Sequence, residues 1–194
     1  MKLAIKIASH NTMSYLPVKQ WYLKPLGFMS RCQSINIIDQ FDLGVRYFDI
    51  RIRYDKNGLC EFAHGLTSYK KNVSRTLGLL NYFATQTDEK VQVRLVLETL
   101  KEDKEQEDFF IKDCDILKAS FPNLVFHCGR RKYDWKQLYD FGNPEPTLDQ
   151  KVSSMTWKIF DDWFPYLYAR FMNRKNRKKE TNKDYLMLDF IHIK

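Results

Sequence analysis

The feature of this sequence that most constrains its fold is a pattern shared by four short apolar segments. Residues 3–9, 45–53, 92–99 and 185–191 each alternate in the way that predicts a β-strand. Successive side chains of a strand point to opposite faces, so each segment has an apolar face and a face that ends in ionisable residues. Those residues lie at or just past the carboxyl ends of the strands: His10, Asp49, Arg51, Glu98 and Asp189.

Helical segments separate the predicted strands, and this alternation favours a parallel sheet in an α/β fold. We expect helices at 34–43, 73–85, 103–120 and 157–173, and further short strands at 59–63 and 124–127. The turn Asp55-Lys56-Asn57-Gly58 predicts a hairpin between 45–53 and 59–63.

A TIM-like (β/α) barrel explains the shared pattern of the strands. In such a barrel the apolar faces contact outer helices, and the polar strand ends meet at the carboxyl-terminal mouth, where active sites lie. A complete barrel usually needs roughly 200 residues or more, so we expect this one to be trimmed or irregular. The alternative is an open sheet with ion pairs at its strand ends. We find no repeat or linker, and we expect one domain over residues 1–194.

The charge of the chain favours an anionic partner. Its formal net charge is +8, which suits lipid headgroups, phosphate esters or nucleic acid. No nucleic-acid-binding motif is present, so we do not expect a nucleic-acid partner. The four cysteines form no CxxC pair, which argues against a zinc site or a disulfide framework: Cys32, Cys60, Cys114 and Cys128.

The sequence has no apolar run as long as a membrane span, and its first apolar stretch is too short for a secretory signal. We therefore expect a cytoplasmic protein or one peripheral to a membrane. Aromatic and apolar residues next to Lys19 and Lys24 suit contact with an anionic lipid surface, with packing in the core as the alternative: Trp21, Tyr22, Leu26 and Phe28. We expect the aromatic stretch 157–171 to pack in the core, and 174–179 to be a solvated basic helix end or loop.

Two histidines at the ends of different strands suggest acid–base chemistry. His10 follows the first strand and His64 follows the hairpin strand, while Asp49 and Arg51 lie between them. This set suits cleavage of a phosphodiester by an internal hydroxyl: one histidine takes the hydroxyl proton, one protonates the leaving oxygen, and a cation stabilises the phosphate charge. The alternative is that each histidine is a structural hydrogen-bonding residue and that Asp49 and Arg51 form a buried ion pair. For His127 and His192 we expect structural roles.

Ordered motifs resemble the X-domain of phosphatidylinositol-specific phospholipase C, closer to the bacterial members. Ser9-His10-Asn11-Thr12 resembles the opening motif of these phosphodiesterases, and 44–51 (GVRYFDIR) resembles their second strand. His64-Gly65, the segment 95–98 (LVLE) and the segment 185–190 (YLMLDF) resemble later motifs. The strong part of the resemblance covers residues 9–65, and 66–184 match in element order.

The resemblance implies a role for each matched residue. His10 would be the general base toward the inositol 2-hydroxyl, with Asp189 orienting it, and His64 the general acid toward the diacylglycerol oxygen. Arg51 would stabilise the phosphate charge, and Asp49 would assist His64 or the leaving group. The product would be a cyclic inositol phosphate. Asn11 and Glu98 would complete the substrate site. Residues for further contacts to the headgroup have no matched position in the motifs. The candidates are Lys101, Arg130, Arg131 and Tyr168, and the alternative is that these side chains are exposed to solvent and bind nothing.

The resemblance leaves two alternatives open for the use of a metal ion. The family has calcium-dependent and calcium-independent branches, and in the latter an arginine replaces the metal. Arg51 favours metal-free chemistry because a cation there repels calcium. The alternative is a calcium site made of Asn11, Asp49 and Glu98, whose oxygens suit that ion.

Two rival functions remain open at this stage. The first is a metal-dependent glycerophosphodiester-type phosphodiesterase, against which Arg51 argues. The second is an inactive barrel that binds a lipid or a phosphate, against which the retained histidines and aspartates argue.

Overall fold

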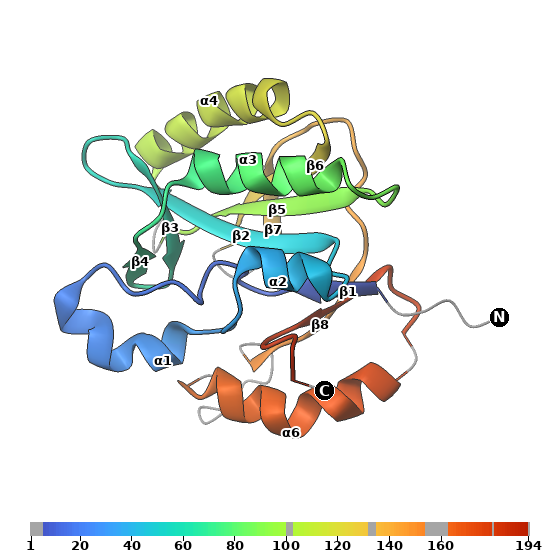
Figure 1. Ribbon diagram of the computed structural model, residues 1–194. Helices are drawn as coiled ribbons and strands as arrows, with labels where there is room; N and C mark the ends of the chain where they lie inside the picture. Colours follow the sequence, from blue (N-terminus) through green and yellow to red (C-terminus); the bar gives the residue numbers. More distant parts are fainter. Residues whose placement is uncertain (1–5, 100–102, 132–134, 154–162, 180, 194) are drawn as a thin grey trace.

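The computed structural model describes residues 6–99, 103–131, 135–153, 163–179 and 181–193. Within these residues nine strands join in one curled sheet (Figure 1), as follows: β1 (Lys6–Ser9), β2 (Tyr47–Tyr54), β3 (Cys60–His64), β4 (Thr67–Tyr69), β5 (Val91–Leu97), β6 (Leu124–Arg131), β7 (Trp135–Tyr139), β8 (Leu148–Lys151) and β9 (Tyr185–Leu188). Seven of them follow the order β7-β6-β5-β2-β1-β9-β8, while β3 and β4 extend from β2 as antiparallel strands.

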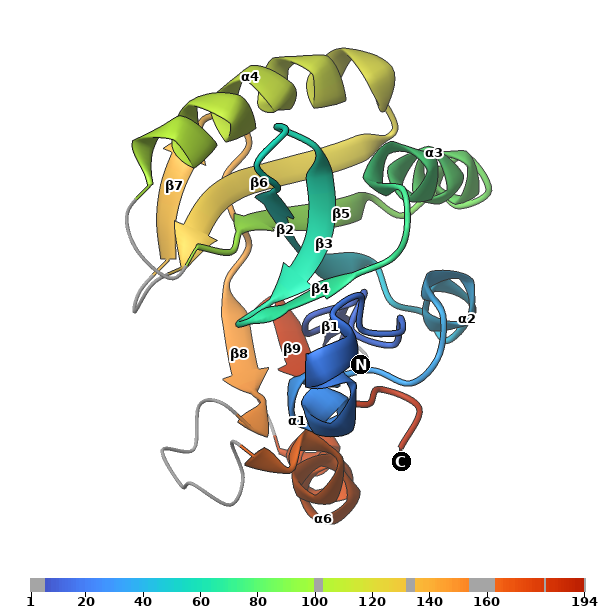
Figure 2. The same cartoon turned by 90° about the vertical axis from the view of Figure 1, so that its left-hand side faces the viewer.

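The sheet is the trimmed, TIM-like α/β architecture that the strand pattern predicts. The strands β6, β5, β2, β1, β9 and β8 run parallel, and β7 returns antiparallel to β6. Among the described residues β7 and β8 do not pair with each other, so the curved sheet stays open between these edges (Figure 2). The structure is therefore a half-barrel rather than a closed one.

Six helical segments surround the sheet in the described part of the chain. They are η1 (Trp21–Leu26), α1 (Gly27–Ser30), α2 (Ile37–Asp42), α3 (Val73–Ala84), α4 (Lys104–Ser120) and α6 (Pro165–Lys178). Polar side chains start three of them, because Asn36, Asn72 and Asp103 each accept hydrogen bonds from backbone N–H groups of the first turn. In Figure 1, α3 and α4 lie on one side of the molecule, and α1 and α6 lie on the opposite side.

The two faces of the strands pack as their alternation predicts. Ile50, Leu95 and Leu188 belong to the large core between the sheet and the helices. Tyr47 and Met187, from the opposite faces of their strands, join a smaller cluster inside the curve of the sheet. Burial of the outer faces stabilises the sheet, because each fully buried aliphatic side chain contributes roughly 1.5–3 kcal/mol.

Several predicted segments have different ends in the structure. The strand predicted at 124–127 continues to Arg131, and residues 3–5 of the first strand lie outside the described residues. Residues 157–162 of the last predicted helix also lie outside them. That helix starts at Pro165, which occupies the first turn where its missing N–H costs nothing, and it continues to Lys178.

The sequence predicts that the aromatic stretch 157–171 packs in the core, and this prediction is wrong for most of the aromatic residues of the stretch that the structure describes. Trp163, Tyr166 and Phe171 are exposed, whereas Tyr168 is buried. The error has a physical reason: Trp163 precedes α6, Tyr166 packs only the edge of its ring against Phe190, and Phe171 lies on the exposed side of the helix. The basic run 174–179 is the end of this helix, and its cations are exposed except for the half-buried Arg177, which agrees with the predicted solvated helix end.

Candidate active site

The register of the parallel strands brings the predicted site residues to one end of the sheet. Ser9 pairs with Phe48 of β2 and with Leu188 of β9. The next residue on each strand is therefore level with the others, which places His10 beside Asp49 and Asp189. Arg51 and Glu98 lie nearby because β2 and β5 are also paired in parallel.

His10 and Asp189 form a buried dyad. The His10 Nδ1 atom lies 2.6 Å from Asp189 Oδ1, and the two side chains are 1% and 0% exposed. An Arg51 terminal nitrogen lies 2.8 Å from His10 Nε2. Because a guanidinium can only donate, Nε2 is the acceptor. The proton therefore lies on Nδ1 and is donated to Asp189, which leaves the Nε2 lone pair for a reacting proton.

A second layer of hydrogen bonds holds Asp189 in place. Its Oδ2 accepts from the Ser153 backbone N–H at 2.8 Å, and its backbone carbonyl accepts from Asn173 Nδ2 of α6 at 2.8 Å. Gln33 donates to the backbone carbonyls of His10 and Leu188 at 3.0 Å each, which ties the end of β1 to the end of β9. Burial raises the pKa of Asp189, but His10 and the hydrogen bonding from Ser153 outweigh it, so the pKa lies below its usual value.

Arg51 is buried between two carboxylates. Its Nε donates to Asp49 Oδ2 at 3.2 Å and one terminal nitrogen donates to Glu98 Oε2 at 3.3 Å. Asp49 Oδ2 also accepts from the Asn11 backbone N–H at 3.0 Å, and Glu98 Oε1 accepts from the Gly65 N–H at 3.0 Å. Burial raises the pKa values of Asp49 and Glu98, yet Arg51 lowers both below their usual range. The guanidinium is thus fixed with its tip against His10.

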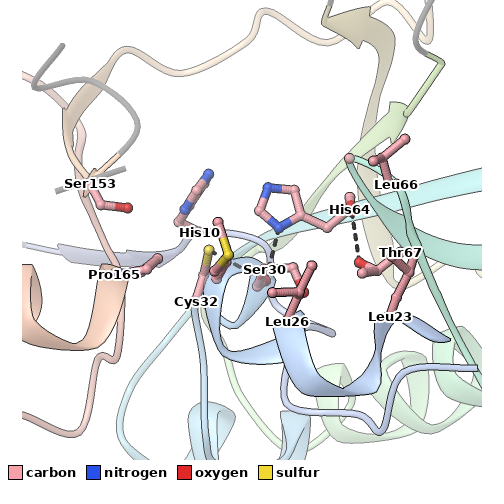
Figure 3. Close-up of a pocket in the computed structure, with 12 residues that line it drawn as sticks. His10, Leu23, Leu26, Ser30, Cys32, His64, Leu66, Thr67, Ser153 and Pro165 are labelled. Carbon is pink, nitrogen blue, oxygen red and sulfur yellow. Dashed lines mark hydrogen bonds between the residues drawn. The ribbon is translucent and has the colours of Figure 1, made fainter. Parts of the chain in front are cut away.

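His64 faces His10 across the mouth of the half-barrel. The ring centroids lie 6.3 Å apart with the planes at 85°. His64 Nδ1 lies 2.9 Å from the Ser30 carbonyl oxygen (Figure 3), so Nδ1 is the donor and Nε2 is the nitrogen left for a ligand. Burial and the Arg51 cation lower the pKa of His64 to about 4.

A largely apolar cavity of about 350 Å³ opens between the two histidines. Figure 3 shows His10, Cys32 and Ser153 on one side of it and His64 with the β3–β4 turn on the other. Its apolar lining comes from η1, α1, the β3–β4 turn and the start of α6: Leu23, Leu26, Met29, Leu66 and Pro165. A ligand that reaches both histidines therefore also contacts an apolar wall.

The segment next to this cavity is exposed rather than packed in the core. Trp21 is 79% exposed, and the other members of the predicted lipid-contact segment are also exposed: Tyr22, Leu26 and Phe28. Among the described residues, no helix is long and apolar enough to cross a membrane. The aromatic surface lies at the rim of the cavity, because Leu23 and Leu26 of the same η1 helix line it.

The calcium site that the sequence leaves open does not fit this geometry. Arg51 bridges Asp49 and Glu98, so the space between the two carboxylates already holds a cation. Asn11 contributes its backbone N–H to Asp49, and its buried side-chain Oδ1 has no hydrogen-bond partner among the described residues. A calcium ion held by these three residues would require Arg51 to leave its carboxylates.

The structure places the other candidate site residues as follows. Asp49 accepts hydrogen bonds from Arg51 and Asn11, and none among the described residues joins it to His64. Arg130 forms an ion pair with Glu107 of α4 at 2.7 Å, on the outer face of the sheet and away from the cavity. Tyr168 is buried in α6. Lys101 and the side chain of Arg131 lie outside the described residues.

The two remaining histidines lie apart from the dyad. His127 is buried inside the sheet, where its Nε2–H donates to Gln92 Oε1 at 2.9 Å and its ring stacks on Tyr47. His192 is exposed beside Ser34. These contacts agree with the structural roles expected for both.

Sequence reasoning missed residues that the fold brings to the site from loops. Ser30 orients His64, Ser153 and Gln33 support the dyad, and the Cys32 thiol lines the cavity. The Cys32 sulfur lies with His10 and Asp189 in a group compact enough for a metal, but His10 Nδ1 and Asp189 Oδ1 of that group already share a hydrogen bond. No spacing in the sequence signals these residues, because their contacts join distant segments.

Comparison with known proteins assigns the fold. No protein-family model and no curated protein matches the sequence. Among solved structures, the phosphatidylinositol-specific phospholipase C of Listeria monocytogenes matches with a TM-score of 0.62 at 18% identity, covering 96% of this chain and 88% of that one. A mutant of the Staphylococcus aureus enzyme matches with a TM-score of 0.59 at 14% identity, covering 96% and 85%. A further structure of that enzyme, described as concerning modulation of its membrane binding, matches with a TM-score of 0.57 at 13% identity, covering 96% and 86%.

The half-barrel and its mouth thus define a fold of the phospholipase C-like phosphodiesterase type. More narrowly, the chain has the fold of the bacterial phosphatidylinositol-specific phospholipases C. This likeness covers 96% of the chain and so extends well beyond residues 9–65, to which the strong sequence motifs are confined.

Proposed function

We propose that this protein is a phosphodiesterase that cleaves the headgroup phosphodiester of phosphatidylinositol or a related phospholipid through a cyclic phosphate. The observation that carries the proposal is the opposed pair of histidines: Asp189 and Arg51 fix His10 Nε2 as the acceptor nitrogen, and the ring centroid of His64 lies 6.3 Å from that of His10 across an apolar cavity. The fold of the lipid-cleaving enzymes from Listeria and Staphylococcus supports the same class of substrate.

His10 is the general base of the proposed reaction. Its Nε2 takes the proton from the hydroxyl next to the phosphodiester, and the hydroxyl oxygen forms a new bond to phosphorus. Asp189 stabilises the imidazolium that results, because its carboxylate accepts the hydrogen bond from Nδ1. Arg51, which donates to Nε2 in the free protein, moves its contact to a phosphate oxygen when the substrate arrives.

Arg51 is the electrophilic group, and the proposed reaction requires no metal. As the attacking oxygen bonds to phosphorus, negative charge grows on the nonbridging oxygens, and a fixed guanidinium stabilises it. Asp49 and Glu98 hold the guanidinium in position from two directions. Asn11, with its partnerless Oδ1, is the candidate to bind a substrate hydroxyl.

His64 is the general acid. Its Nε2 delivers a proton to the glycerol oxygen as the phosphorus–oxygen bond breaks, which releases diacylglycerol and leaves a cyclic inositol phosphate. The lowered pKa of His64 means that the free protein holds this histidine neutral at neutral pH. An arriving phosphate anion that engages Arg51 raises the pKa, because it supplies negative charge and neutralises the nearby cation.

The apolar cavity supports a lipid leaving group over a soluble one. Leu23, Leu26 and Leu66 line the side of the cavity next to His64, where the leaving oxygen would lie. The exposed aromatic rim beside it suits contact with a membrane surface.

The test is release of diacylglycerol from phosphatidylinositol vesicles by the native protein, His10→Ala and His64→Ala, with chelator or with calcium. We expect activity that survives chelator and falls by roughly 10²–10⁴ in each variant. His192→Ala removes an exposed histidine away from the cavity and should keep native activity.

The other outcomes each identify a different function. Activity that requires calcium would overturn the metal-free reaction. Cleavage of glycerophosphoinositol in preference to the lipid would point to a glycerophosphodiester-type enzyme. Binding of phosphatidylinositol without turnover in any condition would point to an inactive lipid-binding barrel.

A further inference from the structure

The exposed side of α6 has basic residues along its length and the exposed ring of Phe171 among them; Trp163 precedes the helix, and Tyr166 in its first turn packs edge-on against Phe190. Trp163, Tyr166 and Phe171 are exposed, with Phe171 73% exposed. Between Trp163 and Lys179 the sequence has six cations and no carboxylate: Arg170, Arg174, Lys175, Arg177, Lys178 and Lys179. All of these except the half-buried Arg177 are exposed.

Three of the cations form a stripe along the helix. Residues four apart lie on the same face, so Arg170, Arg174 and Lys178 follow Tyr166 in one row on the order of 18 Å long. Among the ion pairs of the described residues, none includes a member of this row. Like charges at this spacing destabilise a helix, so the row weakens the isolated fold.

Stabilisation of the helix end explains part of this charge. Cations in the last turn interact favourably with the helix dipole, and Lys178 lies there. Arg177 donates to the Ile191 backbone carbonyl and has a structural contact. Arg170 and Arg174 lie before the last turn, where neither explanation applies. Their exposure without a carboxylate partner points to an external anion.

The basic stripe continues from the rim of the cavity. The Phe164 ring, just before α6, stacks on Phe28 of α1 with centroids 5.7 Å apart, and Pro165 lines the cavity itself. Both views of the ribbon place α1 and α6 together on the side opposite α3 and α4 (Figures 1 and 2). The aromatic rim and the basic stripe are thus neighbouring parts of one side of the molecule.

We propose that the outer face of α6 is an electrostatic docking surface for a membrane rich in anionic phospholipid. The proposal deepens the proposed function and rests on it for the choice of a lipid partner. Aromatic side chains beside cations suit the boundary between headgroups and acyl chains, where rings insert and cations meet lipid phosphates. A nucleic acid would use the cations, but it would not account for the exposed apolar rings of Trp163 and Phe171 around a helix whose first residue, Pro165, lines an apolar cavity.

The buried face of the same helix connects docking to the active site. Asn173 of α6 donates to the backbone carbonyls of Asp189 at 2.8 Å and Phe190 at 3.2 Å. A membrane bound to the outer face therefore contacts a helix that is fixed to the catalytic aspartate, so docking sets the orientation of the cavity mouth toward the lipid surface.

The experiment measures binding of the full chain to phosphatidylcholine vesicles with and without phosphatidylserine. The test variant is Arg170→Gln/Arg174→Gln/Lys178→Gln. The matched control, Lys104→Gln/Lys112→Gln/Lys118→Gln, removes the same charge from α4 on the opposite side of the molecule. At low salt we expect the α6 variant to bind phosphatidylserine vesicles on the order of a hundredfold more weakly, since each cation near such a surface contributes about fivefold.

The outcomes separate this proposal from the proposed function. The docking proposal is supported if the native protein binds only vesicles with phosphatidylserine, binds them more weakly at high salt, and loses this binding in the α6 variant but not in the α4 variant. That result holds even if no phosphodiesterase activity is found. Equal weakening in both triple variants would mean that total charge, not α6, drives binding. Equal binding of native protein and α6 variant, or a larger loss of RNA binding than of vesicle binding in that variant, would overturn it. A melting curve shows whether each variant is folded.

Discussion

His10 has a defined partner on each ring nitrogen, and these partners select one neutral form of the ring. Asp189 accepts from Nδ1, and the Arg51 guanidinium donates to Nε2. The same arrangement explains why the dyad tolerates burial, since each charged group has an opposite charge or a hydrogen-bond donor within reach. The tautomer and orientation of His10 therefore depend on Asp189 and Arg51 rather than on solvent.

The substitution Asp189→Asn tests that dependence. The neutral amide keeps the shape but removes the charge that stabilises the imidazolium, so we expect kcat on phosphatidylinositol vesicles to fall by roughly 10²–10⁴ with KM little changed. Asp88→Asn, at an exposed loop position, is the matched control and should leave kcat unaltered. A native kcat in Asp189→Asn would contradict the proposed role.

His127 makes folding stability depend on pH in a defined window. Burial and Arg94 lower its pKa from 6.5 to about 4, so the folded protein holds the ring neutral while the unfolded chain binds a proton. The contribution of His127 to the free energy of unfolding is therefore fully present above pH 6.5 and is lost as the pH falls toward 4. One such group lowers the free energy of unfolding by about 2 kcal/mol between pH 7 and pH 5.

The substitution His127→Gln isolates this contribution. Denaturant unfolding at pH 7 and pH 5 should show a smaller loss of stability at pH 5 in the variant than in the native protein. His192→Gln changes an exposed histidine and is the control. His64, with its own lowered pKa, destabilises both proteins in the same window, so the comparison rests on the difference between them. An equal loss in native protein and His127→Gln would contradict the assignment.

Among the elements, the β6–β7 hairpin depends on a glycine that the packing requires. A Cβ at Gly129 would meet the Lys136 backbone carbonyl and would lie 2.8 Å from the Trp135 ring. At Gly78, inside α3, a Cβ would lie 3.6 Å from Phe121, which is an ordinary contact. Substitution by alanine is therefore expected to change the stability of the protein in opposite directions at these two glycines.

Gly129→Ala should destabilise the protein by roughly 1–3 kcal/mol, because the overpacked strand pair has to shift. Gly78→Ala should stabilise it by about 0.5–1 kcal/mol, since alanine loses less backbone entropy in a helix. Denaturant unfolding of both variants measures whether each substitution raises or lowers the free energy of unfolding. Destabilisation by Gly78→Ala, or no effect of Gly129→Ala, would show that the packing around these positions differs from the structure.

The sequence predicts the elements whose patterns are regular. Strands β2, β5 and β9 alternate clearly, and the helices at 73–84 and 104–120 have both a cap and an apolar face. It does not predict β4, β7 and β8, because β4 has three residues and β8 (LDQK) has no apolar face. These strands form through pairing with neighbours that are distant in sequence, which no local pattern records.

At the scale of the whole molecule, the site is predictable where it sits on strands and not where it comes from loops. His10, Asp49, Arg51, Glu98 and Asp189 follow from strand ends and from the motif resemblance, and the parallel register brings them together. Ser30, Ser153 and the leucines of the cavity approach from segments whose positions depend on how the half-barrel curves. The open edge between β7 and β8 likewise follows from the sheet order, not from any single segment.

The most direct test of the central claim is phosphorus NMR of the water-soluble product formed from phosphatidylinositol vesicles in the presence of chelator. The account predicts a five-membered cyclic phosphate as the first product, formed by the native protein and lost in His10→Ala. An acyclic inositol phosphate as the first product, or a cyclic one still formed at the native rate by His10→Ala, would contradict internal attack assisted by the His10–Asp189 dyad.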